Sequence, residues 1–200
     1  IASAGFYVWA KHYRLATPCD GGNFTLLCMG DSITAGGYPK TLKEILGNKG
    51  FKNFCVKNLG RNGDTSGEYL KYLTAHPGIL KGRVDLVLLQ LGTNDVRIDH
   101  DHTDTATFEA NMRKIIGIIR QAHPKALVFV ATIPPVLRET PGYFDRTSLN
   151  RVNTEINPVI TRFAKQENCT RVDVYKAFKD HTEWFDEDGI HPNKTGMKQL

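Results

Sequence analysis

Short apolar runs alternate with segments of helical periodicity along this 200-residue chain. This alternation is typical of βαβ units, in which helices join parallel strands and cover the sheet. The most continuous run, VDLVLLQL, is expected for a strand buried on both faces. The predicted strands are Phe24–Met29, Phe54–Leu59, Val84–Leu91, Leu127–Ile133 and Arg171–Val174.

The intervening segments have the spacing of helices that bury one face. The predicted helices are Tyr38–Leu46, Ser66–Thr74, Thr105–Ala122 and Ser148–Gln166, the last kinked near Pro158, with a final helix from Pro192. Five strands with intervening helices predict an α/β fold, a three-layer α/β/α sandwich. Right-handed crossovers limit the topology, and the order we expect for the parallel sheet is flavodoxin-like, 2-1-3-4-5.

We expect residues 23–200 to form one domain and residues 1–22 to be an N-terminal extension. The apolar stretch 1–10 falls far short of the ~20 residues that span a bilayer, so no stable membrane insertion is expected in this segment. The chain begins at Ile1 rather than methionine, so we expect that its start is not the native N-terminus. Secreted and cytoplasmic locations, and the oligomeric state, stay open.

The charge distribution argues against a nucleic-acid partner, and the cysteine spacing argues against a zinc site. The net charge of +5 comes from scattered bases, with no basic run interleaved with aromatic residues, so we expect no nucleic-acid partner. The four cysteines lack the spacing of a zinc site. Cys28 and Cys55 lie in neighbouring predicted strands, where both buried thiols and a bridge between the two are open.

Four polar clusters lie at predicted strand ends or turns. They are Gly30-Asp31-Ser32, Gly63-Asp64-Thr65, Gly92-Thr93-Asn94-Asp95 and Asp188-Gly189-Ile190-His191. In an open parallel sheet the carboxyl ends of the strands share one edge, and ligands bind there. The predicted order 2-1-3-4-5 places Ser32 and Asn94 on either side of the binding crevice.

Three of these residues carry the groups of a serine hydrolase. Ser32 opens a helical stretch and supplies a nucleophile, and His191 can take its proton because a free imidazole titrates at about pH 6.5. Asp188 lies in a turn three residues earlier, from which its carboxylate can orient the ring. Taken singly, Ser32 is equally explained as a helix cap and Asp188 with His191 as a surface turn.

The remaining clusters supply hydrogen-bond donors for an oxyanion hole. The Asn94 side chain and the backbone N–H groups of Gly63 and Ser32 are the predicted donors, with Gly60 as an alternative to Gly63. Asn94 alone is also explained by an ordinary turn at the end of a strand. Because four separate turns supply complementary groups, the set favours acyl-transfer chemistry.

In this order the clusters resemble the SGNH (GDSL-type) hydrolase superfamily of esterases, lipases and acylhydrolases. The resemblance covers Phe24 to about Met197, with Ile33-Thr34 where the family name has leucine. It implies a flavodoxin-like fold, no cofactor or metal, and the roles given above for Ser32, His191, Asp188 and the oxyanion-hole donors.

The function we expect is hydrolysis of a small-molecule ester through an acyl-enzyme, with short acyl groups on a carrier such as acetylated carbohydrate. The loop after the fourth strand supplies candidate substrate contacts at Pro134, Val136 and Tyr143. A lysophospholipase or thioesterase of the same fold is the nearest alternative. A binding module without turnover is a further one.

A metal-dependent phosphoesterase is the alternative from another reaction class. Its ligands would be Asp31, Asn94, Asp95 and His191. The His100-Asp101-His102 stretch, with Asp99 and Asp104 nearby, can also bind a cation, although such stretches are more often solvated loops. The phosphoesterase hypothesis leaves Ser32 without a role.

Overall fold

The computed structural model describes residues 24–200, so the expected extension at residues 1–22 lies outside the described part. Its centre is a parallel sheet with the order β2-β1-β3-β4-β5. The strands are β1 (Phe24–Gly30), β2 (Phe54–Gly60), β3 (Leu86–Gln90), β4 (Leu127–Ala131) and β5 (Thr170–Val172). The predicted flavodoxin-like order is confirmed.

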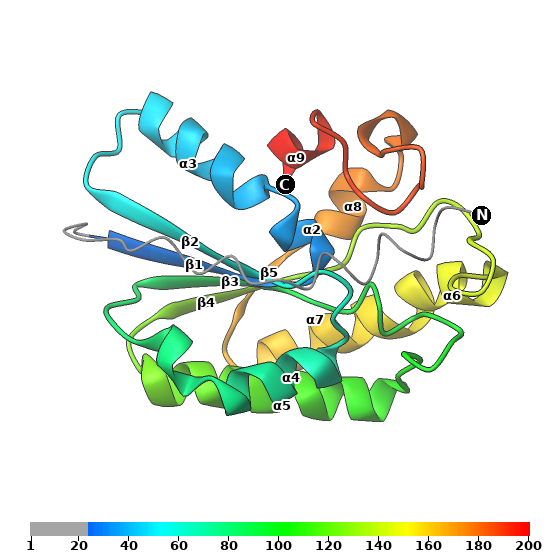
Figure 1. The fold of residues 1–200 in the computed structure, drawn as a ribbon, viewed down its shortest axis with the longest axis horizontal. Helices are drawn as coiled ribbons and strands as arrows, with labels where there is room; N and C mark the ends of the chain where they lie inside the picture. Colours follow the sequence, from blue (N-terminus) through cyan, green and yellow to red (C-terminus); the bar gives the residue numbers. More distant parts are fainter. Residues whose placement is uncertain (1–23) are drawn as a thin grey trace.

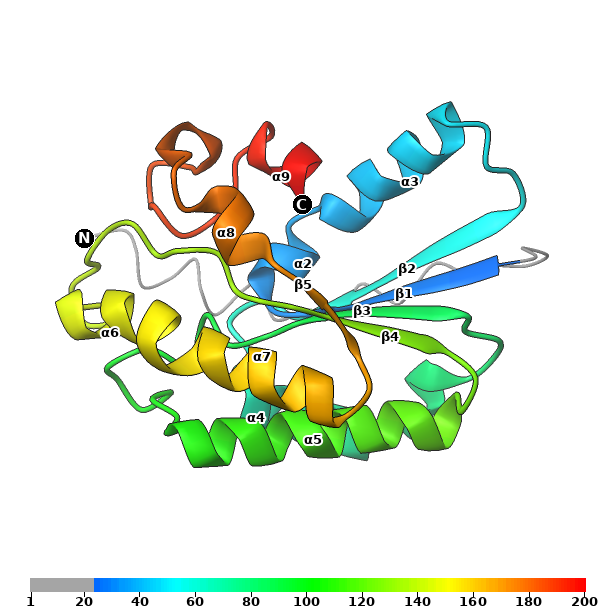
Figure 2. The same ribbon diagram turned by 180° about the vertical axis from the view of Figure 1, so that it is seen from behind.

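Helices cover both faces of this sheet (Figures 1 and 2). One face carries α4 (Ser66–Ala75), α5 (Thr105–Ala122) and α7 (Asn157–Gln166). The other carries α2 (Ser32–Ala35), α3 (Tyr38–Asn48), α8 (Val174–Phe178) and α9 (Gly196–Gln199). The three-layer architecture is therefore confirmed. None of the helices in residues 24–200 combines the length and apolar character needed to cross a membrane.

The larger core lies between the sheet and the face that carries α4, α5 and α7. Phe108, Met112 and Ile116 of α5 are wholly buried there, because their spacing aligns them on one helix face. Leu89 of β3 points into the same core. Leu88 packs on the opposite face and is only partly buried. The apolar run of β3 is therefore not buried equally on both sides.

The helix predicted over 148–166 is interrupted, as the kink near Pro158 suggested. A π-helical turn, Val152–Ile156, separates α6 (Arg146–Arg151) from α7. Pro158 lies in the first turn of α7, where a missing N–H leaves few hydrogen bonds unmade. The change of helical register thus coincides with the residue that cannot continue the ladder.

The predicted strand 171–174 is wrong at its carboxyl end. Strand β5 ends at Val172, and Val174 instead begins the short helix α8. The Asp173 carboxylate accepts the backbone N–H of Lys176 at 3.1 Å and so caps this helix. A local side-chain hydrogen bond therefore outweighs the β propensity of the valines.

The last helix begins at Gly196, four residues after the predicted start at Pro192. Pro192 is held by an isolated β-bridge to Phe185. The Asn193 side chain accepts the N–H groups of Thr195 and Gly196 at 2.9 and 3.1 Å. The proline therefore belongs to the turn that precedes the helix.

The bridge between Cys28 and Cys55 that the sequence left open is absent. Cys55 is disulfide-bonded, whereas Cys28 is a free thiol. Burial raises the pKa of the Cys28 thiol to about 12, against the effect of a hydrogen bond with Tyr38. This thiol stays protonated and behaves as a small apolar side chain.

Gly30→Ala should destabilise the fold at the point where β1 reaches the site. A Cβ at Gly30 would overlap the Gln90 carbonyl oxygen and the Thr34 hydroxyl, whereas one at Gly47 in helix α3 meets nothing within 4 Å. We expect Gly30→Ala to lower the free energy of unfolding by about 2–3 kcal/mol in urea denaturation. Gly47→Ala is the control and should be neutral or gain up to about 1 kcal/mol. Equal stability of the two variants would contradict this packing.

Candidate active site

The candidate site lies at the carboxyl edge of the sheet, where β1 passes into the short helix α2 (Figure 1). Ser32 is the first residue of α2. The buried Asp31 carboxylate caps this helix by accepting the Ile33 N–H at 3.0 Å. Gly30 has no room for a side chain, because a Cβ there would meet the Gln90 carbonyl oxygen and the Thr34 hydroxyl, so the end of β1 packs closely against β3 and α2.

The structure brings Ser32 and His191 into direct contact although 159 residues separate them. His191 Nε2 lies 2.8 Å from Ser32 Oγ, and His191 Nδ1 lies 2.6 Å from Asp188 Oδ2. With the proton on Nδ1 facing the carboxylate, Nε2 is free to accept the proton of the serine hydroxyl. This geometry can activate a serine oxygen as a nucleophile.

A compact turn holds Asp188 in place. Its second oxygen, Oδ1, accepts the backbone N–H groups of Ile190 and His191 at 2.8 and 2.9 Å. Gly189 has a φ of 68°, and the Arg138 side chain packs closely against its Cα. A side chain at Gly189 would therefore be strained by the backbone conformation and would meet Arg138.

Asp188 is suited to stabilise a protonated histidine. Partial burial alone would raise the pKa of its carboxyl. Hydrogen bonds from the His191 ring and from the two backbone N–H groups outweigh that effect, and the pKa is lowered. The carboxylate therefore remains ionised and opposes the positive charge that forms on the ring.

The predicted oxyanion-hole residues Gly63 and Asn94 follow β2 and β3, the two strands that flank β1 in the sheet. Asn94 Nδ2 donates one hydrogen bond to the Asp64 carbonyl at 2.9 Å, which orients the amide and leaves its second N–H for a ligand. Gly63 has a φ of 77°, and a Cβ there would meet open space. Among residues 24–200, the backbone N–H groups of Ser32 and Gly63 have no hydrogen-bond acceptor.

The alternative donor Gly60 is otherwise engaged. Its backbone N–H donates to Asn58 Oδ1 at 2.9 Å, and it packs so closely on Ala35 of α2 that no Cβ would fit. Gly60 therefore allows α2 to approach β2, and Gly63 is the glycine with a free N–H in the turn.

Two wholly buried carboxylates flank these groups, one after β1 and one after β3. Burial raises the pKa of Asp31 to about 6, although the Ile33 N–H, the charge on His191 and the Thr93 hydroxyl oppose the rise. Burial likewise raises the pKa of Asp95 to about 6, against the hydroxyl and backbone N–H of Ser66. Neither carboxylate reaches bulk water, so both are parts of the framework.

The ligand set proposed for a metal-dependent phosphoesterase does not converge. The Asp95 carboxylate faces Ser66, the Asn94 amide is bonded to Asp64, and His191 lies between a hydroxyl and a carboxylate. In the described part of the chain, the donors close enough to share a cation are those of Asp99, His100 and Asp101. Both of those carboxylates already form ion pairs with Arg97.

The three candidate substrate contacts differ in exposure. Pro134 and Val136 are buried, and Val136 belongs to the larger core. Tyr143 is 39% exposed, and the Arg97 guanidinium lies 4.6 Å from the centre of its ring. Of the three candidates, Tyr143 is therefore the one that a ligand can reach without a change in the core.

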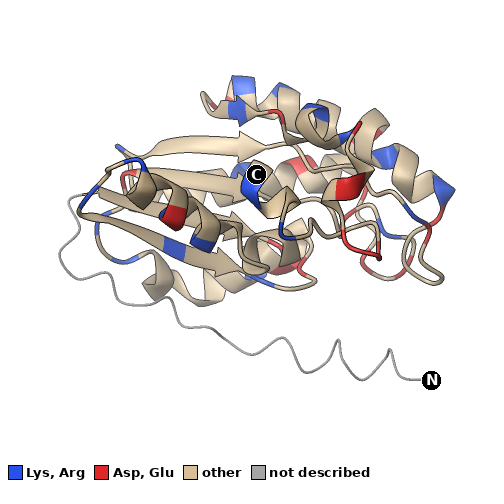
Figure 3. Ribbon diagram, turned by 90° about the horizontal axis from the view of Figure 1, so that it is seen from above, with Lys and Arg blue, Asp and Glu red and all other residues tan. Residues whose placement is uncertain are grey.

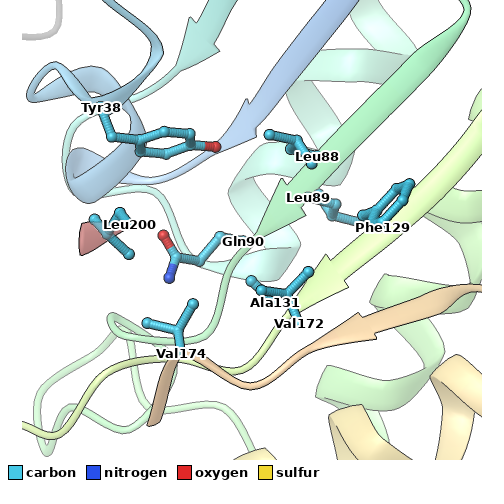
Figure 4. Close-up of a pocket in the computed structure, with 9 residues that line it drawn as sticks. All are labelled: Tyr38, Leu88, Leu89, Gln90, Phe129, Ala131, Val172, Val174 and Leu200. Carbon is cyan, nitrogen blue, oxygen red and sulfur yellow. The ribbon is translucent and has the colours of Figure 1, made fainter. Parts of the chain in front are cut away.

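A cavity of about 120 Å³ lies on the sheet face that carries α3 and α8 (Figure 4). It is lined mainly by apolar side chains, and the buried Gln90 amide points into it. None of the proposed nucleophile, base or oxyanion-hole residues lines it. Along the ribbon, positions of Lys and Arg are interspersed with those of Asp and Glu (Figure 3).

Sequence reasoning missed the residues that support the oxyanion-hole segments. Ser66, Asn111 and Arg151 form hydrogen bonds with or around Asp95, although they come from three separate helices. The signal available was weak: Asp95 directly follows Asn94, and Ser66 follows a threonine typical of a helix N-cap. Nothing in the sequence pairs these positions.

Comparison with known proteins agrees with this geometry. Residues 28–199 match the model of the GDSL-like Lipase/Acylhydrolase family. The chain belongs to this family. The resemblance inferred from the four clusters is therefore confirmed. Family membership itself leaves the substrate open.

Two curated relatives carry esterase names. The chain is 26% identical over 220 residues to a multidomain esterase of Ruminococcus flavefaciens and 29% identical over 201 residues to an acetylxylan esterase of Xylanibacter ruminicola. These matches include 90% and 86% of this GDSL-family chain. They span only 28% and 40% of the two relatives, so each relative contains much that this chain does not match.

Solved structures show the same fold. A lipase/acylhydrolase from Enterococcus faecalis superposes with a TM-score of 0.70 at 25% identity, covering 88% of this chain and 90% of that one. An acetyl xylan esterase from Geobacillus stearothermophilus gives 0.69 at 20% identity, with 92% and 93% covered. At these identities the likeness concerns mainly the GDSL-family fold.

Asp31→Asn should remove a pH dependence of stability. Because burial raises the pKa of Asp31 from 3.8 to about 6, the folded protein binds a proton in this range that the unfolded chain does not. The wild type should therefore lose on the order of 2–3 kcal/mol of stability between about pH 4 and pH 6, relative to the variant.

Urea unfolding of both proteins between about pH 4 and pH 7 measures this difference. Asp104→Asn is a control of opposite sign, because hydrogen bonds from Thr107 lower the pKa of the exposed Asp104 carboxyl. As the pH rises through the acid range, the wild type should gain stability relative to the Asp104→Asn variant. If the difference in free energy of unfolding between Asp31→Asn and wild type does not change with pH, then the pKa of Asp31 is not raised in the folded protein.

Proposed function

We propose that this chain is a serine ester hydrolase that forms an acyl-enzyme on Ser32 and prefers short acyl esters such as acetylated carbohydrate. The observation that carries the proposal is the hydrogen-bonded series from Ser32 Oγ through His191 to Asp188, at 2.8 and 2.6 Å. A serine that only caps a helix needs no contact with His191, and a surface turn formed by Asp188 and His191 needs no contact with Ser32.

In the first half of the reaction, His191 accepts the proton as Ser32 Oγ attacks the acyl carbonyl carbon. Asp188 opposes the charge on the resulting imidazolium. The negative charge that develops on the carbonyl oxygen is held by the N–H groups of Ser32 and Gly63 and by the Asn94 amide. His191 then gives its proton to the leaving alcohol.

In the second half, water replaces the alcohol. His191 takes a proton from the water as it attacks the acyl-enzyme, and the same three donors hold the second oxyanion. Collapse of this intermediate returns the proton to Ser32 and releases the carboxylic acid. Every proton transfer in this cycle uses His191, so no further acid or base is required.

Two observations support a short acyl group. Relatives in the curated and structural comparisons are named acetylxylan esterases. In addition, the apolar cavity on the sheet is not lined by Ser32 or His191, so it does not extend the serine site into an acyl tunnel. A lysophospholipase or thioesterase would need such an apolar channel for its long chain.

Ser32→Ala should lower kcat/KM for p-nitrophenyl acetate by at least about 10³-fold, because the nucleophile is lost. Labelling by a fluorophosphonate should vanish with it. His100→Ala is a suitable control, since that imidazole is 86% exposed and its ion-pair partners within residues 24–200 are the neighbouring carboxylates of Asp99 and Asp101. Wild-type turnover by Ser32→Ala would defeat the assignment of the nucleophile.

A panel of esters should separate the candidate substrate classes. We expect turnover of p-nitrophenyl acetate and acetylated xylo-oligosaccharide at rates at least about 10-fold above those for octanoyl esters, lysophosphatidylcholine and acyl thioesters. Activity should be unchanged by EDTA, and bis-p-nitrophenyl phosphate should be stable. Faster cleavage of long-chain substrates would instead favour the lysophospholipase or thioesterase alternative, and a silent panel would favour the binding module.

A further inference from the structure

We infer that Asp95 is a positioning residue for the oxyanion hole, because its buried carboxylate holds the turn that carries Gly63 in register with Asn94. The inference rests on the proposed function and assigns a task within the same reaction. Asp95 would touch neither substrate nor reacting atoms and would act through its two neighbouring segments.

The Asp95 carboxylate contacts Ser66 at two atoms. The Ser66 backbone N–H lies 2.9 Å from Oδ2 and 3.2 Å from Oδ1, and the Ser66 hydroxyl donates to Oδ1 at 2.5 Å. Both residues are wholly buried. Asn111 Nδ2 donates to the same hydroxyl at 3.1 Å, which fixes the direction of its proton towards Asp95.

Helix α4 does not depend on Asp95 for its cap. Thr65 and Glu68 already form a reciprocal capping box at its start. The negative charge of Asp95 is favourable beside the helix N-terminus, yet burying a carboxylate is costly for the fold. A stabilising cap is therefore an incomplete explanation for this residue.

The contact joins the two segments that bear the non-serine donors. Asn94 directly precedes Asp95, and Gly63 lies three residues before Ser66. A second hydrogen bond joins the same segments close by, from Asn94 Nδ2 to the Asp64 carbonyl at 2.9 Å. Together with the Asp95 contacts to Ser66, it attaches the turn to the Asn94 segment at two points and so restrains its orientation. A displacement of about 1 Å is enough to weaken an oxyanion contact.

The main chain of Asp95 is itself anchored on the other side. Its carbonyl accepts the Thr103 N–H at 3.0 Å and Arg151 Nη1 at 3.3 Å. The buried Arg151 also donates to the Thr103 carbonyl at 2.7 Å. Asp95 is thus a fixed support to which the Gly63 turn is attached, rather than a mobile side chain that follows it.

Asp95→Asn tests the inference because it keeps the volume but presents an amide N–H₂ to the donors of Ser66. We expect kcat for p-nitrophenyl acetate to fall about 10- to 100-fold, with KM changed by less than about 3-fold. The Ki of an alkylboronic acid, whose serine adduct is a tetrahedral anion, should rise by a similar factor. All rates are divided by the concentration of Ser32 that a fluorophosphonate labels at the end point.

Two further variants separate positioning from stability. Ser66→Ala keeps the backbone N–H bond and should lose about 3- to 10-fold in kcat, with a matching rise in boronate Ki. Asp104→Asn is the matched control, because Asp104 accepts the N–H and hydroxyl of Thr107 at the start of α5 at 2.9 and 2.7 Å. It should leave kcat and Ki within about 2-fold of wild type.

Coupling to Asn94 gives a second test. The double variant Asn94→Ala/Asp95→Asn should lose less in kcat than the product of the single losses, because both changes affect the same donors. Wild-type kcat and Ki in Asp95→Asn and Ser66→Ala, or a lower kcat at unchanged Ki, would overturn the inference. A wild-type protein that neither hydrolyses esters nor reacts with the fluorophosphonate would overturn the proposed function, and this inference with it.

Discussion

The hydrogen bond between His191 and Ser32 is the interaction on which the proposed chemistry depends, and it requires the whole sheet to be assembled. It joins a residue after the first strand to one in the last turn, with a 2.8 Å contact between Nε2 and Oγ. Such a contact forms only if the parallel sheet and its crossovers place both ends of the chain at one edge. The order β2-β1-β3-β4-β5 places β1 between β2 and β3, the strands that precede the segments of Gly63 and Asn94.

Around that contact the residues divide into those that react and those that hold them. Ser32, His191 and Asp188 form the proposed reacting series. The polar groups behind them are buried and bonded to one another, as Asp95 is to Ser66. Buried carboxylates with pKa values raised to about 6 are costly for a fold. Asp31 directly precedes Ser32 and Asp95 directly follows Asn94, so the cost in folding free energy falls on residues that hold the proposed donors in position.

Much of the fold could be predicted because periodicity is a local property. The buried face of α5 follows directly from the spacing of Phe108, Met112 and Ile116. The predictions failed where single hydrogen bonds decided the structure. Asp173 ends β5 early by capping α8, and Asn193 delays α9 beyond Pro192. Propensity cannot anticipate these bonds, since each depends on the orientation of one side chain.

The sequence by itself determined the fold class and the identity of the candidate groups, because apolar spacing and turn residues act over short distances. The strand order was an expectation from the βαβ pattern, and the tertiary structure confirmed it. The tertiary structure decided which groups meet. The Gly60 N–H is bonded to Asn58, which favours Gly63 as the proposed donor, and Cys28 is a free thiol. The tertiary structure also joined Asp95 to Ser66, 29 residues apart. Contacts of this kind depend on three-dimensional packing, and no local pattern in the chain encodes them.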